Sequence, residues 1–210
     1  MARGRDDMRV GIIGVGMTAF RPSTPEYNWK ELMFEAASRA YADAGVDPRT
    51  DVDSFLTCAE DYYEGFGIFD EFTPDQLGAA LRRMCTVSGD GLQGLANAFM
   101  QIRTGLVDIA VVEAHSKVSD VLTLDGIMEH ALDPIWNKPL GGHPFVVAGL
   151  EASAFLRATR TSPKALAAVV AKNRTNALRN PLSAYGAAVD ADQVLQSEER
   201  FTPLRALDIS

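Results

Sequence analysis

The sequence predicts an α/β layered domain followed by a mainly helical region. Over the first 112 residues, short apolar runs suited to strands alternate with longer stretches in which apolar residues recur at helical spacing. The run from Leu106 to Val112 barely alternates, which is typical of a strand covered by helices on both faces. After Val112 the pattern changes to loops and further helices. We therefore expect residues 1–118 to form an α/β core and residues 119–210 a second, helical domain.

Each expected element carries its own local signals. Trp29, Met33 and Ala40 share one side of a helix that ends before Gly45, a suitable left-handed cap. Pro74 suits the first position of another helix. Strands are expected at Val10–Gly14, Asp53–Cys58, Met84–Val87 and Leu106–Val112. Helices are expected at Trp29–Ala44, Pro74–Arg83, Gly91–Thr104, Phe145–Arg160, from Ser162-Pro163 to Asn180, and at Asp190–Ser197. The remaining expectations are a loop with one helical turn at Ala59–Phe72 and an extended end at Phe201–Ser210.

Composition excludes several classes of function. The net charge of −8 argues against general binding to nucleic acid or to an anionic membrane. Residues 1–9 lack the apolar stretch of a signal peptide, and no apolar run is long enough to span a membrane. Two cysteines, Cys58 and Cys85, make neither a disulfide framework nor a metal quartet, so a reducing cytoplasm is the expected location. We expect no metal and no tightly bound cofactor.

The most informative stretch runs from Met84 to Asp120. A short strand turns sharply through Ser88-Gly89-Asp90-Gly91 into a helix that ends at Gly105. A small residue at such a turn is exposed at a helix N-terminus, where free N–H groups and the helix dipole favour negative charge. Acyl-transfer enzymes place a nucleophile at such a point. The helix itself carries apolar residues at helical spacing, namely Leu92, Leu95, Ala96, Phe99 and Ile102.

This stretch resembles the thiolase superfamily, most closely the short-looped thiolases of the archaeal and sterol-carrier-protein type. In that family a strand leads to a nucleophilic cysteine, then Gly or Ala, Ser, Gly and a long helix closing on Gly-x-x-Asp. Laid without gaps on Ser88-Gly89-Asp90-Gly91 and Gly105-Leu106-Val107-Asp108, the family cysteine falls on Ser88. The resemblance extends to Val10–Thr18 and Pro203–Ser210. Two departures are the serine itself and a chain that stops near the middle of a family-length protein.

The resemblance implies a fold, a chemistry and partners. The fold would be a thiolase-like layered α/β/α domain with a mixed sheet, plus a helical loop domain that holds coenzyme A. The duplicated C-terminal half, which brings a histidine and a second cysteine, would be absent. The chemistry would be formation or cleavage of a carbon–carbon bond in an acyl-CoA substrate. Because Ser88 replaces the cysteine, the resemblance is compatible with two forms of this chemistry, an unusual acyltransferase or the retro-aldol branch of the superfamily.

An alternative class is a non-catalytic structural or CoA-binding subunit of a thiolase-like hetero-oligomer. The resemblance further implies a homo- or hetero-oligomer, with a complementary half and a small zinc-ribbon/OB-fold protein as partners. Nucleic acid and membrane are not expected as partners.

The candidate site residues each have a functional and a structural interpretation. Ser88 occupies the nucleophile position, but serine is also a common helix N-cap and no base is evident nearby. His115 follows a buried strand and would form a polar cluster with Glu113 and Lys117, or simply bond to backbone. His143 lies where many thiolases place a side chain against the acyl group. With Gly89 and Gly91 at the turn, these histidines are the expected substrate-binding residues.

Other reactive or charged residues have mostly structural interpretations. Cys85 and Cys58 behave as small apolar residues if they are buried in strands. The second region is locally basic, so one or two of its cations would meet coenzyme A phosphates while the others lie on solvated helix faces. These cations are Arg157, Arg160, Lys164, Lys172, Arg174 and Arg179.

Overall fold

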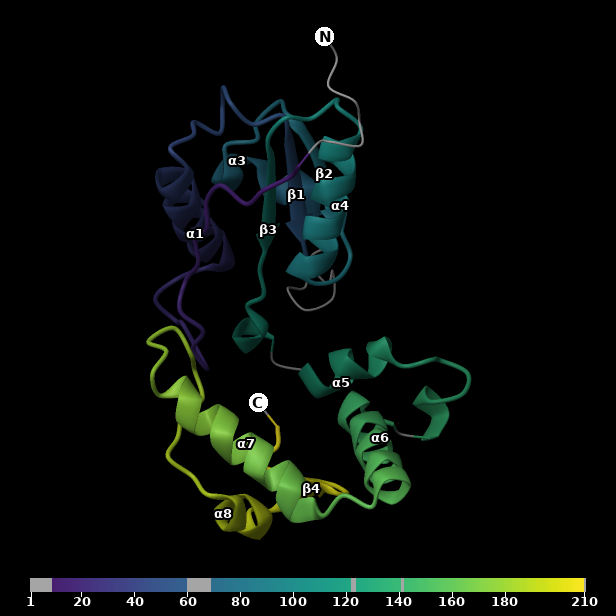
Figure 1. Cartoon of the computed structure of the whole chain (residues 1–210). Coiled ribbons are helices and arrows are strands. Elements are labelled where there is room, and N and C mark those ends of the chain that lie inside the picture. Colours follow the sequence, from purple (N-terminus) through teal and green to yellow (C-terminus); the bar gives the residue numbers. More distant parts are fainter. Residues whose placement is uncertain (1–8, 60–68, 122–123, 141, 210) are drawn as a thin grey trace. The chain divides into compact units, whose positions relative to one another are not determined.

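A computed structural model describes residues 9–59, 69–121, 124–140 and 142–209 (Figure 1). The chain divides into two compact units, one of residues 1–18 and 23–122 and one of residues 19–22 and 123–210. Within the described ranges, no helix is both long enough and apolar enough to cross a membrane.

The first unit is built on a parallel sheet with the strand order β2-β1-β3. Strand β1 (Ser54–Cys58) lies in the centre and is buried along its whole length, between β2 (Arg83–Val87) and β3 (Ala110–Ala114). Leu56 lies opposite Cys85 on one side and Val112 on the other. Because the strands are parallel and in register, their carboxyl ends meet at one edge, where sites of α/β proteins gather. The predicted α/β class is confirmed, although the strands described here form a parallel sheet rather than a mixed one.

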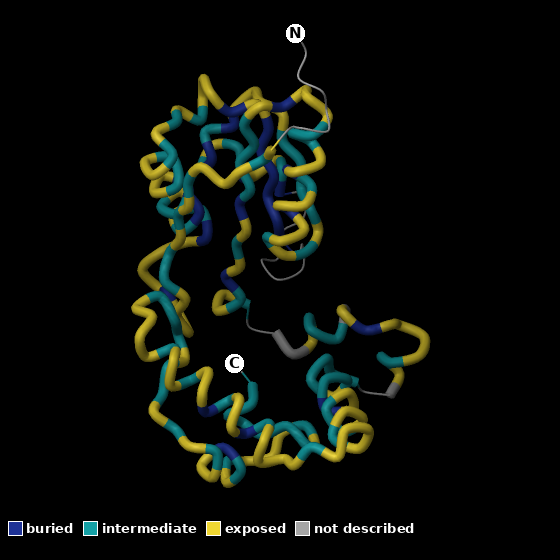
Figure 2. Tube along the Cα trace, in the orientation of Figure 1, coloured by how far each residue is buried: buried dark blue, intermediate teal, exposed yellow. Residues whose placement is uncertain are grey.

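One face of this sheet packs on helix α1 (Trp29–Ala44) and on two single-turn helices, α2 (Phe69–Phe72) and α3 (Pro74–Leu77). The predicted bounds of α1 are confirmed: Asn28 and Glu31 form a capping box at its start, and Gly45 ends it with a φ of 68°. The apolar core lies between these helices and the strands, where the tubes of Figure 2 are darkest. Its largest fully buried side chains are Met33, Phe55, Phe69 and Leu77.

The other face is covered by helix α4 (Gly91–Arg103), seen beside the sheet in Figure 1. Only Gly94 and Ala98 are buried on this helix. A side-chain carbon at Gly94 would overlap the Sγ of Cys58 and lie 2.6 Å from the Cγ1 of Val112. The helix therefore approaches the strands closely through small residues. Four of its large apolar side chains are exposed, namely Leu92, Leu95, Phe99 and Met100.

Two predicted bounds in this unit are wrong. The helix starting at Pro74 ends at Leu77, because Gly78 turns left-handed with a φ of 72°, and Arg83 already begins β2. Strand β3 starts at Ala110 rather than Leu106. The reason is that the Asp53 carboxylate accepts hydrogen bonds from the backbone of residues 108 and 109, at 2.8 and 3.2 Å, and draws the chain to the sheet only there.

The predicted first strand, Val10–Gly14, is also wrong as far as the structure describes it, since residues 9–20 contain no strand. The segment packs on α1 instead. A side-chain carbon at Gly14 would lie 2.6 Å from the carbonyl oxygen of Ala40, and the N–H of Val15 donates to Asp43 at 2.9 Å. Close packing on a helix backbone takes the place of strand pairing.

The second unit is mainly helical. Its helices are α5 (Leu124–Met128), α6 (Pro144–Thr159), α7 (Pro163–Ala177) and α8 (Ala191–Gln196), with a short hairpin of β4 (Glu199–Phe201) and β5 (Leu204–Arg205). Single 3₁₀ turns lie at Val118–Asp120, Glu129–Ala131 and Lys138–Leu140, the first of them in the first unit. Ser162 caps α7 as predicted. A small core of Ala167, Ala171 and Val194 joins α7 to α8. The end expected to be extended folds into the hairpin and turns.

Candidate active-site edge of the sheet

The turn between β2 and α4 places Ser88 at the carboxyl edge of the sheet, with its side chain exposed. Gly89 has a φ of 128°, a conformation that L side chains rarely adopt, and a side-chain carbon there would overlap the amide of Gln93. Asp90 is the N-cap of α4. Its carboxylate accepts hydrogen bonds from the N–H groups of Leu92 at 2.9 Å and Gln93 at 3.2 Å. The interpretation of Ser88 as the helix cap is therefore wrong, because Asp90 is the extended residue directly before the helix.

The Asp90 cap changes the electrostatics of this turn. Two of the N–H groups that could stabilise an anion already donate to the Asp90 carboxylate. The negative charge of this carboxylate also interacts favourably with the positive end of the helix dipole. Within the described residues, no side chain forms a hydrogen bond with the Ser88 hydroxyl. A serine nucleophile needs an adjacent base, and no described side chain is hydrogen-bonded to Ser88 in that role.

The two cysteines support the structural interpretation. Cys58 is 1% exposed, beneath Gly94 of α4. Burial, assisted by the nearby negative charge of Glu113, raises the pKa of the Cys58 thiol to about 11, although the Gly94 N–H opposes the shift. Cys85 is half-buried on the neighbouring strand. A thiol held neutral by burial is a poor nucleophile.

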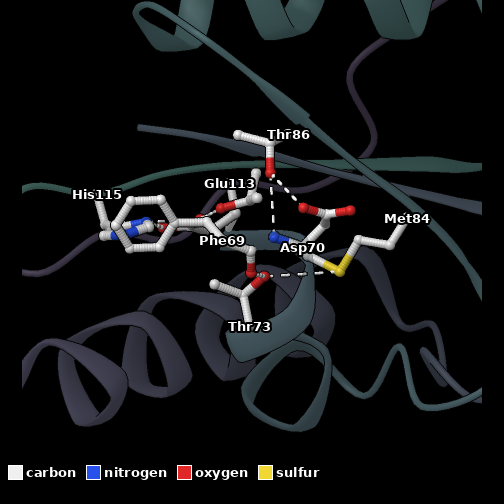
Figure 3. Close-up of polar contacts among 8 residues, drawn as sticks. Phe69, Asp70, Thr73, Met84, Thr86, Glu113 and His115 are labelled. Carbon is white, nitrogen blue, oxygen red and sulfur yellow. Dashed lines mark hydrogen bonds and ion pairs between the residues drawn. The ribbon is translucent and has the colours of Figure 1, made fainter. Parts of the chain in front are cut away.

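A buried polar cluster lies at the same edge on the opposite face of the sheet (Figure 3). The Nδ1 of His115 lies 3.0 Å from each carboxylate oxygen of Glu113, and the Thr57 hydroxyl donates to the same carboxylate at 2.7 Å. The side chains of His115 and Glu113 are each 7% exposed. Burial, with the charge of Glu113 as a second cause, raises the pKa of the Tyr41 hydroxyl. The structure thus joins His115 to Glu113.

Lys117, the third member of the predicted cluster, binds a different carboxylate. Its ammonium donates to both oxygens of Asp120, at 2.6 and 2.8 Å. Lys117 is buried at 6% exposure, so this pairing compensates a desolvated charge.

Aromatic rings hold the His115 imidazole in place. It stacks on Trp29 with centroids 5.3 Å apart and meets the edge of Phe69 at 4.9 Å. Helix α2, which carries Phe69, is tied to β2 because the Thr86 hydroxyl accepts from the N–H of Asp70 at 3.0 Å. The Nε2 atom of His115 is buried and has no hydrogen-bond partner within the described structure. Unpaired buried nitrogens are rare in folded proteins.

His143 belongs to the second unit, where it caps α6. Its Nδ1 accepts from the N–H of Phe145 at 3.2 Å, and its ring stacks on Phe201 with centroids 5.2 Å apart. Two of the basic candidates also have structural contacts. Lys164 pairs with Asp192 at 2.7 Å, and Arg174 donates to the carbonyls of the C-terminal segment. No group of three or more metal-ligand side chains occurs among the described residues.

The known proteins that this chain resembles match it over most of its length. No protein-family model matches it. It is 26% identical to sterol carrier protein 2 of Gallus gallus, covering 95% of this chain and 38% of that protein. It is also 26% identical to an acetyl-CoA acetyltransferase of Methanothermobacter thermautotrophicus, covering 96% of this chain and 53% of the relative. The chain therefore spans about half the length of these relatives, or less.

Solved structures agree with these relatives. The structure of an Ltp2-ChsH2(DUF35) aldolase matches with a TM-score of 0.71 and 22% identity over 93% of this chain and 50% of that one. An SCP2-thiolase like protein type 1 from Mycobacterium smegmatis, described as monomeric, matches with a TM-score of 0.60 and 22% identity over 89% and 39%. The resemblance to the thiolase superfamily is confirmed. At these identities the structures show a thiolase-like fold.

In this thiolase-like chain, the turn at the sheet edge departs from the family pattern at two positions. Ser88 stands at the position of the cysteine, and Asp90 stands at the position of the following serine. Sequence reasoning considered Ser88 as the N-cap of this helix and did not consider Asp90, even though aspartate is as good an N-cap as serine. Thr57 and Trp29 were missed as neighbours of His115, because contacts between distant parts of the chain leave no local signal.

Proposed function

We propose that this chain is part of a thiolase-like protein that acts on acyl-CoA thioesters at a carbon–carbon bond, without a covalent acyl-enzyme at Ser88. The observation that carries the proposal is the cap of α4, where the chain's own Asp90 carboxylate occupies two donors beside the nucleophile position. A negative charge there opposes a second one developing on Ser88. The serine hydroxyl also has no hydrogen bond to a base among the described residues.

Retro-aldol cleavage is the chemistry that fits these constraints. A base removes the proton of a 3-hydroxyl group, and the oxygen electrons form a carbonyl as the C2–C3 bond breaks. The bond electrons pass to the thioester enolate, which is then protonated at C2. No enzyme nucleophile is required. The fold neighbour with a TM-score of 0.71 is named an aldolase, which supports this branch as a hypothesis.

The second candidate is a non-catalytic CoA-binding or structural subunit. It is favoured by the absence of a hydrogen-bonding side-chain partner for Ser88 in the described structure. Under either candidate we propose acyl-CoA as ligand. We also propose an assembly with a complementary half and a zinc-ribbon/OB-fold protein, in the cytoplasm. The aldolase neighbour is named for two components, Ltp2 and ChsH2, and this supports a partner subunit.

The two candidates are separated by incubating the native assembly with 3-hydroxyacyl-CoA and with the matching 3-ketoacyl-CoA plus coenzyme A. Chromatography with mass spectrometry would follow the thioesters, and intact-mass measurement would detect adducts. We expect the hydroxy compound to yield a shortened acyl-CoA and a carbonyl product, with no adduct on Ser88. A stoichiometric acyl adduct on Ser88 would overturn the proposal. Binding without turnover would establish the non-catalytic candidate.

A further inference from the structure

His115 is held on its ring faces and at one nitrogen, while its other nitrogen has no partner within the described structure. We propose that the Nε2 atom of His115 is a preformed acceptor for one O–H group, which is either the hydroxyl of a bound ligand or a buried water. The site consists of His115, Glu113 and Thr57 between Trp29 and Phe69. It lies at the carboxyl edge of the sheet.

The hydrogen bond between His115 and Glu113 determines the tautomer of the His115 ring. A carboxylate accepts hydrogen bonds but cannot donate them, so the Nδ1 of His115 must carry the proton that it shares with Glu113. In the neutral ring, Nε2 is then a lone-pair acceptor. The Thr57 hydroxyl donates to the same carboxylate at 2.7 Å, which keeps Glu113 in its accepting role.

The ring cannot turn to relieve its unpaired nitrogen. Trp29 stacks on one face with an interplanar angle of 15°, while Phe69 stands at 76° to the ring. Leaving a buried acceptor unpaired is costly, so a small O–H donor gains binding energy there that it would not gain at an exposed histidine. The side chain is 7% exposed, so a donor to Nε2 would bind in a largely desolvated site.

The donor comes from one of two sources. If the site belongs to the proposed reaction, the donor is the 3-hydroxyl of the substrate, and His115 oriented by Glu113 is the base that takes its proton. This assignment rests on the proposed function. If the donor is a water molecule, Nε2 accepts its hydrogen bond in the same geometry, and the assignment does not depend on the proposed function.

His143 provides an internal control, because its hydrogen bonding demands the opposite tautomer. Its Nδ1 accepts from a backbone N–H at 3.2 Å, so its proton must lie on Nε2 in the neutral ring. The chain has three histidines, so His115→Gln and His143→Gln variants suffice to assign their signals.

The experiment is a two-dimensional ¹H–¹⁵N spectrum of the histidine rings in the 210-residue chain at neutral pH. We expect His115 to favour the Nδ1–H form by about tenfold or more, because its proton lies in a charge-assisted hydrogen bond. His143 should show the Nε2–H form. A His115 ring protonated at Nε2, either as the other tautomer or as a cation, would overturn the proposal.

Added ligands then separate the two sources. A 3-hydroxyacyl-CoA should move the Nε2 signal of His115, whereas the same acyl-CoA lacking the hydroxyl should not. A water source instead gives a cross-relaxation signal to water that neither thioester changes. Thr57→Val should weaken the preference for Nδ1–H without altering the His143 signals. The spectrum of the unliganded chain does not depend on turnover, so failure of the proposed reaction would leave this test intact.

Discussion

The two faces of the sheet in the first unit are covered in opposite ways. On the face toward α1, α2 and α3, large side chains such as Phe55 and Phe69 are fully buried. On the other face, α4 touches the strands through Gly94 and Ala98, and its large side chains turn outward, with Leu92 74% and Phe99 50% exposed. Both helices α1 and α4 are amphipathic in sequence. Among the described residues, α1 buries the large side chains of Trp29 and Met33, whereas α4 buries only Gly94 and Ala98.

The face toward α1 therefore has a complete apolar core, whereas the outer surface of α4 on the other face remains uncovered in the described structure. The face toward α1 gains its stability from burial of large apolar side chains inside the chain itself. Helix α4 meets the strands through small residues, and its large apolar side chains lie on its outer surface. No described residue of the unit covers them. A helix that is apolar on its outer side too belongs in the interior of a larger assembly. Five measurements test this comparison.

The largest effect is expected for truncation of a buried ring. Phe55→Ala should lower the free energy of unfolding by about 3–5 kcal/mol, because Phe55 is fully buried and its loss leaves a cavity. Phe99→Ala on α4 should change it by less than about 0.5 kcal/mol, since that ring is half exposed. Urea unfolding of the dilute chain measures both. Equal losses would show that the outer side of α4 is covered within this chain.

The second measurement concerns association. The 210-residue chain should form dimers or larger species, because the outer face of α4 is apolar. Phe99→Glu should shift it toward monomer. Phe34→Glu is the matched control, since Phe34 is 60% exposed on α1. Light scattering after size exclusion gives the masses. A monomeric wild-type chain at micromolar concentration, or equal effects of both variants, would contradict this.

The third measurement tests the close approach of α4. Gly94→Ala should cost about 1–3 kcal/mol, because the new methyl group overlaps the Sγ of Cys58 and the helix must shift. Cys58→Ala in the same chain should recover part of that loss by removing the sulfur. Gly91→Ala is the milder comparison, since its methyl group would lie 3.3 Å from the Cβ of Ala114, a tight contact that needs a much smaller shift than the overlap at Gly94. If Gly94→Ala is neutral, α4 packs less tightly on the strands than these distances require.

The sequence predicts which residues of α4 share a side, but not which side meets the sheet. Helical spacing groups Leu92, Leu95 and Phe99 together, and the small residues Gly94 and Ala98, four positions apart, form a second group. Only the distance between helix and strands decides between them. Strands β1 and β2 and helix α1 were predictable, because their apolar patterns and the caps of α1 are local.

The candidate site, like the fold, was predictable only where the neighbouring residues are close in the sequence. The period of two along a strand puts Glu113 and His115 on one side, so their proximity follows from the sequence. The rings that fix His115 come from residues 29 and 69, far away in the chain, and only the fold brings them there. The choice of Asp90 over Ser88 as cap depends on the left-handed turn at Gly89, which spacing alone does not reveal.

The fourth measurement concerns pH and the buried thiol under α4. Burial raises the pKa of Cys58 from 9.0 to about 11, so above pH 9 the unfolded chain releases a proton that the folded chain keeps. Stability is therefore lost as pH rises through this window, by about 1 kcal/mol at pH 10. Cys58→Ala should flatten that part of the pH profile. Identical slopes for wild type and variant between pH 8 and 10 would contradict the assignment.

The smallest difference is expected at the turn that enters α4. Asp90→Ala should cost about 1 kcal/mol, because it removes the acceptor for the N–H groups of Leu92 and Gln93. Ser88→Ala should cost less than about 0.5 kcal/mol, since an exposed side chain without a described partner is lost. Asp90→Asn keeps the cap and removes its charge, so it should retain most of the stability. Thermal unfolding at matched pH measures all three variants. If Ser88→Ala cost as much as Asp90→Ala, Ser88 would be part of the cap. The charge of Asp90 would then no longer count against an anionic nucleophile at that position.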